Sequence, residues 1–190
     1  MSDVEVEEVR AVVRWMRSEI GVPFAVVGGS AILPEVPVGT KDVDILVSGH
    51  DLEKVDQRME DRPEALPLEP ATGTIRGTEI TIGGSSIQVD FLSASAFGGA
   101  EFVEYVLGPG SKAFAGVRRA RPAVVFYMRL ALDEWRENIP SIERDLRVGI
   151  PESTLDGAIA VARRFGRGDR VAKRVVEVRR LLAHLDPRRE

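Results

Sequence analysis

The sequence contains no cysteine and only two histidines, His50 and His184. The absence of cysteine excludes a disulfide framework, a thiolate zinc site and a cysteine nucleophile. Two histidines leave little room for a histidine-rich metal site. Any metal ion bound by this chain must therefore rely mainly on oxygen ligands.

Long apolar runs are also missing. No stretch approaches the roughly 20 apolar residues that a helix needs to cross a bilayer, and the first residues are acidic, without a secretory apolar segment. Hydrophobic residues make up 44% and charged residues 29% of the 190 residues, which is typical of a globular protein. We therefore expect a cytoplasmic protein of one domain, or two small ones, with no membrane partner.

The net charge of the chain is −4, but the charged residues are unevenly distributed along it. The first 110 residues are acidic and the remainder is rich in arginine. The basic half either attracts an anionic ligand or consists of solvated arginine-covered helices, and the sequence leaves both open. Aromatic residues amount to 6% and do not alternate with basic ones, so a single-stranded nucleic acid has no support from this pattern.

Apolar spacing and turn residues predict the α/β (α+β) class. Short strands are expected at 24–27 and 43–47, and Gly83-Gly84 predicts a hairpin between 79–82 and 86–92. After Gly110 every segment has helical periodicity. We predict a mixed α/β domain over residues 1–115 and a helical bundle over residues 116–190 that packs on it. The longer helices are expected at 3–19, 51–60, 101–107, 122–135, 141–147, 154–165 and 171–185.

A glycine turn follows the first predicted strand. Gly28, Gly29 and Ser30 lie between that strand and a short helix. Glycine has no Cβ, so the backbone here can come close to a bulky anion. We expect the N–H groups of this turn and the Ser30 hydroxyl to bind the phosphates of a nucleotide.

Acidic residues mark the next strand. Asp42 and Asp44 are one residue apart, so strand alternation places both on one face. Asp90 has matching parity on a later strand, and three carboxylates converge if the two strands are neighbours. A bound cation would relieve their repulsion, and oxygen ligands alone favour Mg²⁺ or Mn²⁺. The alternative is an ordinary solvated strand face.

This combination resembles the signature of the DNA polymerase β-type nucleotidyltransferase superfamily over roughly residues 20–95. An apolar residue and Gly-Gly-Ser precede Asp-apolar-Asp-apolar by about ten residues, and Asp90 stands where the superfamily places its third carboxylate. The resemblance implies a mixed sheet with flanking helices and two-metal catalysis. It makes Asp42, Asp44 and Asp90 catalytic metal ligands for transfer of a nucleoside monophosphate from an NTP such as ATP to a hydroxyl.

Within that superfamily the chain is similar to small prokaryotic enzymes related to the toxin halves of AbiE-type systems and to antibiotic nucleotidyltransferases. Thr40 is similar to their Thr or Ser at that place. They often carry an arginine shortly before it; here Val38 stands in that neighbourhood, and the only nearby cation is Lys41, which we assign to nucleotide binding. The resemblance implies an acceptor that is RNA, protein or a small molecule, and a cognate antitoxin if the protein is a toxin.

Arg129 is the only charged residue in the apolar stretch 124–132. A buried guanidinium requires a carboxylate or phosphate partner. Arg129 therefore either binds the nucleotide phosphates or the acceptor, or forms an internal salt bridge with Asp145 or Asp133. The family's helical part often carries a basic residue in an apolar helix and then a Lys/Arg-Asp pair, which Arg129 and Arg144-Asp145 resemble.

A second group of cations precedes the first helix of the basic half. It either contacts phosphates or forms a solvated basic turn, and it comprises Lys112, Arg118, Arg119 and Arg121.

The sequence therefore favours a Mg²⁺-dependent nucleotidyltransferase. Two alternatives stand beside it: a catalytically silent module of the same fold that binds a protein or nucleic acid, and a phosphohydrolase that uses the same acids. The presence of all three acids favours the enzyme.

Overall fold

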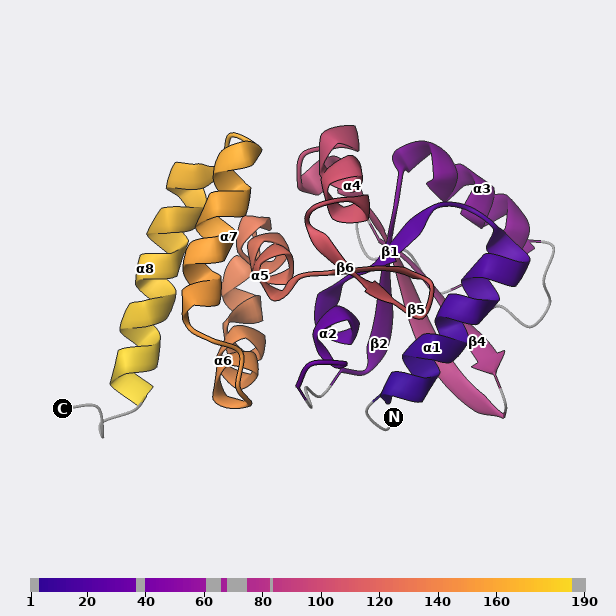
Figure 1. Cartoon of the computed structure of the whole chain (residues 1–190), viewed down its shortest axis with the longest axis horizontal. Coiled ribbons are helices and arrows are strands. Elements are labelled where there is room, and N and C mark those ends of the chain that lie inside the picture. The colour runs from indigo at the N-terminus through magenta and orange to yellow at the C-terminus, as the bar shows by residue number, and fades with distance from the viewer. Residues whose placement is uncertain (1–3, 37–39, 61–65, 68–74, 83, 186–190) are drawn as a thin grey trace. The chain divides into compact units, whose positions relative to one another are not determined.

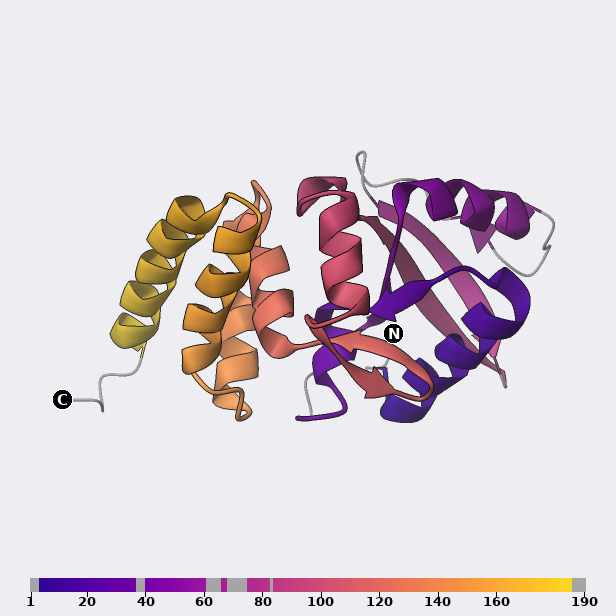
Figure 2. The ribbon, with the colours of Figure 1, turned by 45° about the horizontal axis from the view of Figure 1, so that its top comes forward.

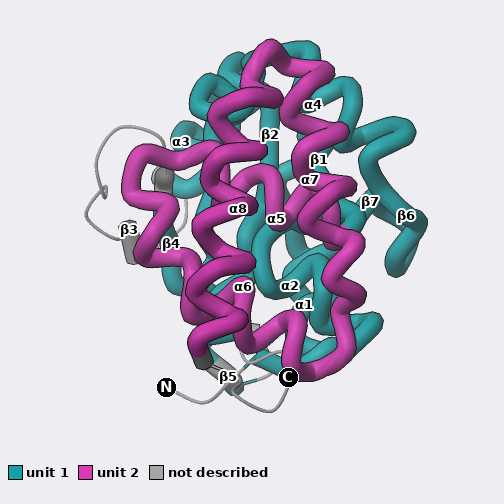
Figure 3. The backbone as a smooth tube through the Cα atoms, turned by 90° about the vertical axis from the view of Figure 1, so that its left-hand side faces the viewer, with its two compact units in different colours: residues 1–121 teal, residues 122–190 magenta. Residues whose placement is uncertain are grey.

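The computed structural model describes residues 4–36, 40–60, 66–67, 75–82 and 84–185, and Figure 1 shows the chain as a ribbon. The chain divides into two compact units, Met1–Arg121 and Pro122–Glu190, coloured separately in Figure 3. The sequence placed the division between residues 115 and 116, which falls inside a hairpin of the first unit. The predicted class, a mixed α/β sheet with helices followed by helical segments, is confirmed.

The first unit contains a seven-stranded sheet in the order β3-β4-β5-β2-β1-β7-β6. β2 and β5 are parallel, as are β1 and β7, and the other neighbours are antiparallel. The sheet is therefore mixed. Its strands are β1 (Phe24–Val26), β2 (Asp42–Val47), β3 (Leu66–Pro67), β4 (Ile75–Ile82), β5 (Ser85–Ser93), β6 (Ser111–Phe114) and β7 (Val117–Ala120).

The helices of this unit lie beside the sheet (Figure 1). α1 (Val6–Trp15) buries Val9, Val12 and Val13, the helical spacing that predicted it. A π-helical turn, Met16–Ile20, extends α1 until Gly21 ends it in the left-handed conformation, as expected from the sequence. The others are α2 (Gly28–Ile32), α3 (Gly49–Glu60), a 3-10 turn (Ala94–Ala96) and α4 (Ala100–Leu107).

The β6–β7 hairpin corrects the prediction that only helices follow Gly110 (Figure 2). The two strands turn at Ala115 and Gly116, which both have positive φ, 49° and 82°. β7 also pairs in parallel with β1, joining Val26 to Arg119. This pairing satisfies the backbone hydrogen-bonding groups of both strands. It joins segments far apart in the chain, so no local pattern in the sequence predicts it.

The second unit is helical, as predicted. α7 packs against both α5 and α8, and Leu155, Ala158, Val171, Val175 and Val178 are fully buried on α7 and α8. No helix in the described part of the chain combines the length and apolar character of a membrane span. The elements are α5 (Pro122–Ala131), a 3-10 turn (Trp135–Asn138), α6 (Ile139–Arg147), α7 (Ser153–Arg164) and α8 (Gly168–Leu185).

Candidate metal centre

Two neighbouring parallel strands bring three carboxylates together. The register of β2 and β5 aligns Asp42 with Gln88 and Asp44 with Asp90. The alternate residues Val43 and Ile45 are fully buried, so strand alternation turns the acids away from that apolar face. Asp42, Asp44 and Asp90 each offer a carboxylate oxygen, and these oxygens all lie within 4.8 Å of one another. The predicted convergence is confirmed.

Neighbouring polar side chains orient two of these acids. The Thr40 hydroxyl lies 3.1 Å from Asp42 Oδ1 and 3.2 Å from the Asp42 carbonyl oxygen. It can donate to either oxygen, and both belong to Asp42. Gln88 Nε2 donates to Asp90 Oδ1 at 3.1 Å. Thr40 is 7% exposed, which restricts its rotation. The sequence did not assign Gln88 a role, although its i, i+2 spacing from Asp90 on one strand is the signal that could have found it.

The electrostatics of the site favour a cation. Burial raises the pKa of Asp90, the Gln88 hydrogen bond offsets part of that effect, and the negative charge of Asp42 raises the pKa further. Within the described residues no ion pair joins Asp42 or Asp90 to a basic side chain. Carboxylate oxygens without histidine or cysteine suit Mg²⁺ or Mn²⁺. The chemistry of the donor set therefore fits a hard divalent ion.

Gly28 approaches one of these carboxylates closely. Its φ is +59°, and a Cβ on this residue would lie 1.7 Å from Asp44 Oδ2 and 2.5 Å from Asp44 Cγ. No side chain fits there. The glycine turn predicted that the backbone comes close to an anionic group, and in the structure the Gly28 backbone comes close to the Asp44 carboxylate. Gly29 is buried in the first turn of α2.

Ser30 is fully buried and joins α2 to β2. Its Oγ donates to the Val27 carbonyl oxygen at 2.8 Å and accepts from the Asp44 N–H at 3.2 Å. The Val27 N–H in turn donates to the Asp44 carbonyl oxygen at 2.9 Å. These contacts give Ser30 a positioning task at Asp44, and its predicted contact with phosphate stays a prediction.

The two predicted cationic nucleotide ligands differ in their surroundings. Lys41 is exposed directly before β2. Arg129, on α5, has a side chain that is 11% exposed and donates from Nη1 to Oδ2 of the fully buried Asp145 at 2.5 Å. The salt bridge is one of the two arrangements that the sequence left open, and nucleotide binding by either residue stays a prediction.

The cations before α5 are not one solvated turn. Lys112 and Arg119 belong to the β6–β7 hairpin, and both contact Glu35. Arg119 is 8% exposed. Sequence reasoning missed Glu35 and the burial of Arg119, because both follow from the pairing of β7 with β1.

No protein-family model matches the sequence, and no curated protein matches it. Eight chains of known structure match. A protein from Thermotoga maritima described as a nucleotidyltransferase has 21% identity and a TM-score of 0.34, covering 48% of this chain and 59% of its own. ANT(2″)-Ia in complex with adenylyl-2″-tobramycin has 14% identity and a TM-score of 0.47, covering 94% and 97%. A protein from H. pylori described as a nucleotidyltransferase has 10% identity and a TM-score of 0.40, covering 96% and 83%.

Two of these neighbours are described as nucleotidyltransferases, and the third is described by its complex with adenylyl-2″-tobramycin. Their low TM-scores and identities establish no family for this chain. This chain spans only 59% of the Thermotoga maritima protein. The function of this chain must therefore be inferred from the residues of the site itself.

Proposed function

We propose that the protein is a Mg²⁺-dependent nucleotidyltransferase that moves a nucleoside monophosphate from an NTP to a hydroxyl group of an acceptor. One observation carries the proposal: Asp42, Asp44 and Asp90 place carboxylate oxygens within 4.8 Å of one another. A Gly28 that leaves no room for a side chain lies against Asp44. Nucleotidyl transfer needs such acids to hold divalent ions beside a triphosphate.

The three aspartates would together hold the Mg²⁺ or Mn²⁺ that the reaction needs. When bound, the ions neutralise developing charge on the phosphates and lower the pKa of the attacking hydroxyl. Thr40 and Gln88 keep Asp42 and Asp90 in orientations that suit this role.

Asp90 is the residue we assign to proton transfer, beside its role as a ligand. Its carboxylate lies beside those of the two other acids, and a carboxylate within hydrogen-bond reach of the reacting hydroxyl can act as a general base. The acceptor oxygen attacks the α-phosphorus and its proton passes to Asp90. The bond from the α-phosphorus to the bridging oxygen breaks, and pyrophosphate leaves.

The backbone of Gly28 and Gly29 and the side chain of Lys41 are our candidates for contacts with the triphosphate. The first N–H groups of a helix have no partner within it, so those of this turn are available as donors. Lys41 supports the assignment because it is exposed immediately before Asp42. Arg129 is a weaker candidate, since binding a nucleotide would require it to leave Asp145.

A labelling experiment tests the transfer reaction and identifies the class of acceptor. The full chain is incubated with Mg²⁺ and each radiolabelled NTP in turn, together with total RNA, protein extract or aminoglycosides. We expect one fraction to take up label, and Asp44→Asn to lower the rate at least about 100-fold, because metal-assisted charge stabilisation contributes several kcal/mol. Glu53→Gln, an exposed acid on α3, is the matched control and should leave transfer unchanged.

Full activity of the Asp44→Asn variant would refute the metal mechanism. Calorimetry with Mn²⁺ and ATP separates the silent-module alternative, because a module without the site should give no metal-dependent heat of nucleotide binding. The toxin role and its antitoxin partner extend the same proposal. If the acceptor is RNA or protein, expression should slow growth and Asp44→Asn should abolish that effect.

A further inference from the structure

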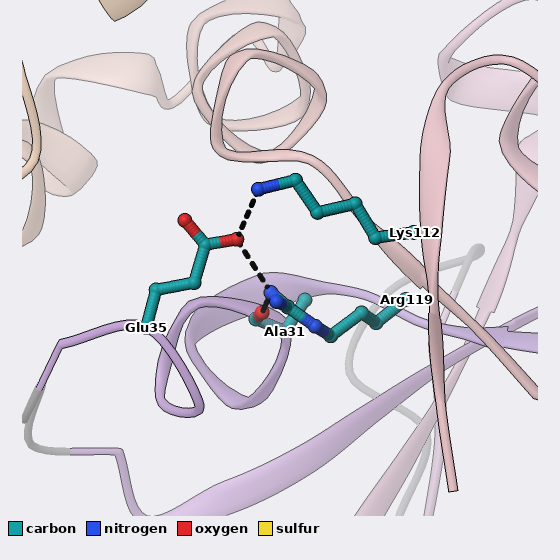
Figure 4. Close-up of polar contacts among 4 residues, drawn as sticks. All are labelled: Ala31, Glu35, Lys112 and Arg119. Carbon is teal, nitrogen blue, oxygen red and sulfur yellow. Dashed lines mark hydrogen bonds and ion pairs between the residues drawn. The ribbon is translucent and has the colours of Figure 1, made fainter.

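A polar cluster joins α2 to the β6–β7 hairpin (Figure 4). Glu35 Oε1 accepts hydrogen bonds from Lys112 Nζ at 3.0 Å and from Arg119 Nη1 at 2.8 Å. Arg119 Nη1 also donates to the Ala31 carbonyl oxygen at 2.8 Å. Burial alone would raise the pKa of Glu35, but the hydrogen bonds and charges of Lys112 and Arg119 together hold it below its ordinary value.

The cluster fixes the end of a very short helix. α2 has only five residues, and a helix of this length is not stable in isolation, so tertiary contacts decide its position. Ala31 lies in its last turn, and the Glu35 N–H donates to the Ile32 carbonyl oxygen just behind it. Arg119 reaches this end from β7, where it is in register with Val26 of β1.

The start of the same helix holds Asp44. Gly28 lies against the Asp44 carboxylate, and Ser30 Oγ accepts from the Asp44 N–H. Gly28 and Ala31 are about 4.5 Å apart along the helix axis, at 1.5 Å per residue. A shift of Ala31 away from Arg119 is therefore transmitted to Gly28 and Ser30 within a single turn.

The cost of burying Arg119 also indicates that this residue fixes the position of α2. This residue is 8% exposed, and its Nε makes no hydrogen bond within the described part of the chain. A buried guanidinium with an unpaired N–H is a poor source of stability, and apolar residues often stabilise such a position better. Its directed bonds to Ala31 and Glu35 give it instead a means of fixing the position of α2.

We propose that Arg119, on β7, is a positioning residue for the metal-binding carboxylate of Asp44 and acts on it through α2. Glu35 takes part by holding the guanidinium against the Ala31 carbonyl. Lys112 has a side chain that is 42% exposed and contributes mainly charge. The inference rests on the proposed metal role of Asp44.

The test is the affinity of the full chain for Mn²⁺ alone, measured by isothermal titration calorimetry well below the melting temperature. We expect Arg119→Met to weaken Mn²⁺ binding about 10–100-fold, the usual cost of removing a residue that orients a metal ligand. Arg119→Lys keeps the charge but not the fork of donors, so it should fall between that variant and wild type.

Two controls separate positioning from simple loss of stability. Arg118→Met removes an exposed arginine from the same strand, and Val175→Ala leaves a cavity in the core of the second unit. Both should bind Mn²⁺ as wild type does, although the second also lowers the melting temperature. If Arg119→Met does not fold, Arg119→Lys carries the test.

The outcomes distinguish this inference from the function on which it rests. Mn²⁺ binding by wild type that is lost in Asp44→Asn but unchanged in both Arg119 variants would overturn the positioning role alone. If wild type binds no Mn²⁺ and transfers no label, the metal site is wrong and the role of Arg119 falls with it.

Discussion

Two carboxylates of the first unit, Asp90 and Glu35, are partly withdrawn from water but have pKa values shifted in opposite directions. Burial and the charge of Asp42 raise the pKa of Asp90 against a single hydrogen bond from Gln88. At Glu35 burial acts in the same sense, but Lys112 and Arg119 outweigh it. The difference lies in the partners. Glu35 is paired with two cations, whereas within the described residues no ion pair joins Asp90 to a basic side chain.

Asp145 in the second unit extends the comparison. It is fully buried and accepts from Arg129, while its Oδ1 makes no hydrogen bond within the described residues. A carboxylate this deep depends on its partner more than Glu35 does, because removing one member of a buried pair leaves an uncompensated charge. The cost of losing a cation should therefore follow the depth of the acid.

The largest effect is expected at this buried pair. Arg129→Met should lower the free energy of unfolding by about 3–5 kcal/mol, since Asp145 is left charged in an apolar interior. Urea denaturation measures the change. Arg144→Met is the matched control, because Arg144 is 42% exposed and its Nε lies 3.5 Å from Asp145 Oδ1, and it should cost about 1 kcal/mol or less.

The double variant Arg129→Met/Asp145→Leu sharpens this result. It should recover most of the lost stability, because the buried charge is then gone as well. Nucleotidyl transfer by the double variant at the wild-type rate would exclude Arg129 as a nucleotide ligand. Wild-type stability of Arg129→Met would contradict the pairing with Asp145.

The next effect concerns Gly28, and Gly21 provides its control. Both have positive φ, +59° and +70°, but a Cβ on Gly21 would meet nothing within 4 Å. Alanine should therefore cost a similar 1–2 kcal/mol of backbone strain at each site. Only Gly28→Ala displaces Asp44, so it alone should weaken Mn²⁺ binding, by about 10–100-fold in calorimetry. Equal Mn²⁺ affinities of the two variants would show that the contact with Gly28 does not position Asp44.

The smallest effect is the pH dependence of stability without metal. The raised pKa of Asp90 means that the folded protein binds this proton more tightly than the unfolded chain does. Stability is therefore lost as pH rises from about 4 through the folded pKa. Asp90→Asn removes that loss and should raise the melting temperature in EDTA near neutral pH by about 2 °C, the scale of a change below 1 kcal/mol.

Glu35→Gln should behave in the opposite sense. The lowered pKa of Glu35 contributes stability that is present above about pH 4 and is lost as pH falls through the folded pKa. The variant should therefore be less stable than wild type near neutral pH, by about 1 kcal/mol or less in the free energy of unfolding, and approach wild type in acid. Thermal melts of both variants across this range test the pair, and changes of the same sign would contradict the comparison.

Local patterns in the sequence were sufficient for much of the fold. The helical spacing of Val9, Val12 and Val13 predicted α1, and Gly21 predicted its end. The one-residue separation of Asp42 and Asp44 predicted that they share a face, because alternation along a strand needs no information from distant residues. The parity of Asp90 was equally readable.

The sequence predicted the hairpin of β4 and β5, but it could not supply which strands far apart in the chain are neighbours. The parallel pairing of β2 with β5 brings Asp90 to Asp44. The pairing of β7 with β1 buries Arg119, which was expected in a solvated basic turn, and lets it donate to the Ala31 carbonyl oxygen of α2. Strand pairing joins residues that are far apart in the chain, so no local period encodes it.

The same limit applies to individual partners. The sequence by itself predicted that three acids and a glycine turn belong to one kind of chemistry, and that Arg129 needs an anion. Only the tertiary structure decided that Asp145 is that anion, that Gly28 lies against Asp44, and that Ser30 holds the backbone of β2. Residue type fixes what a side chain requires, whereas the packing of distant segments fixes which group meets the requirement.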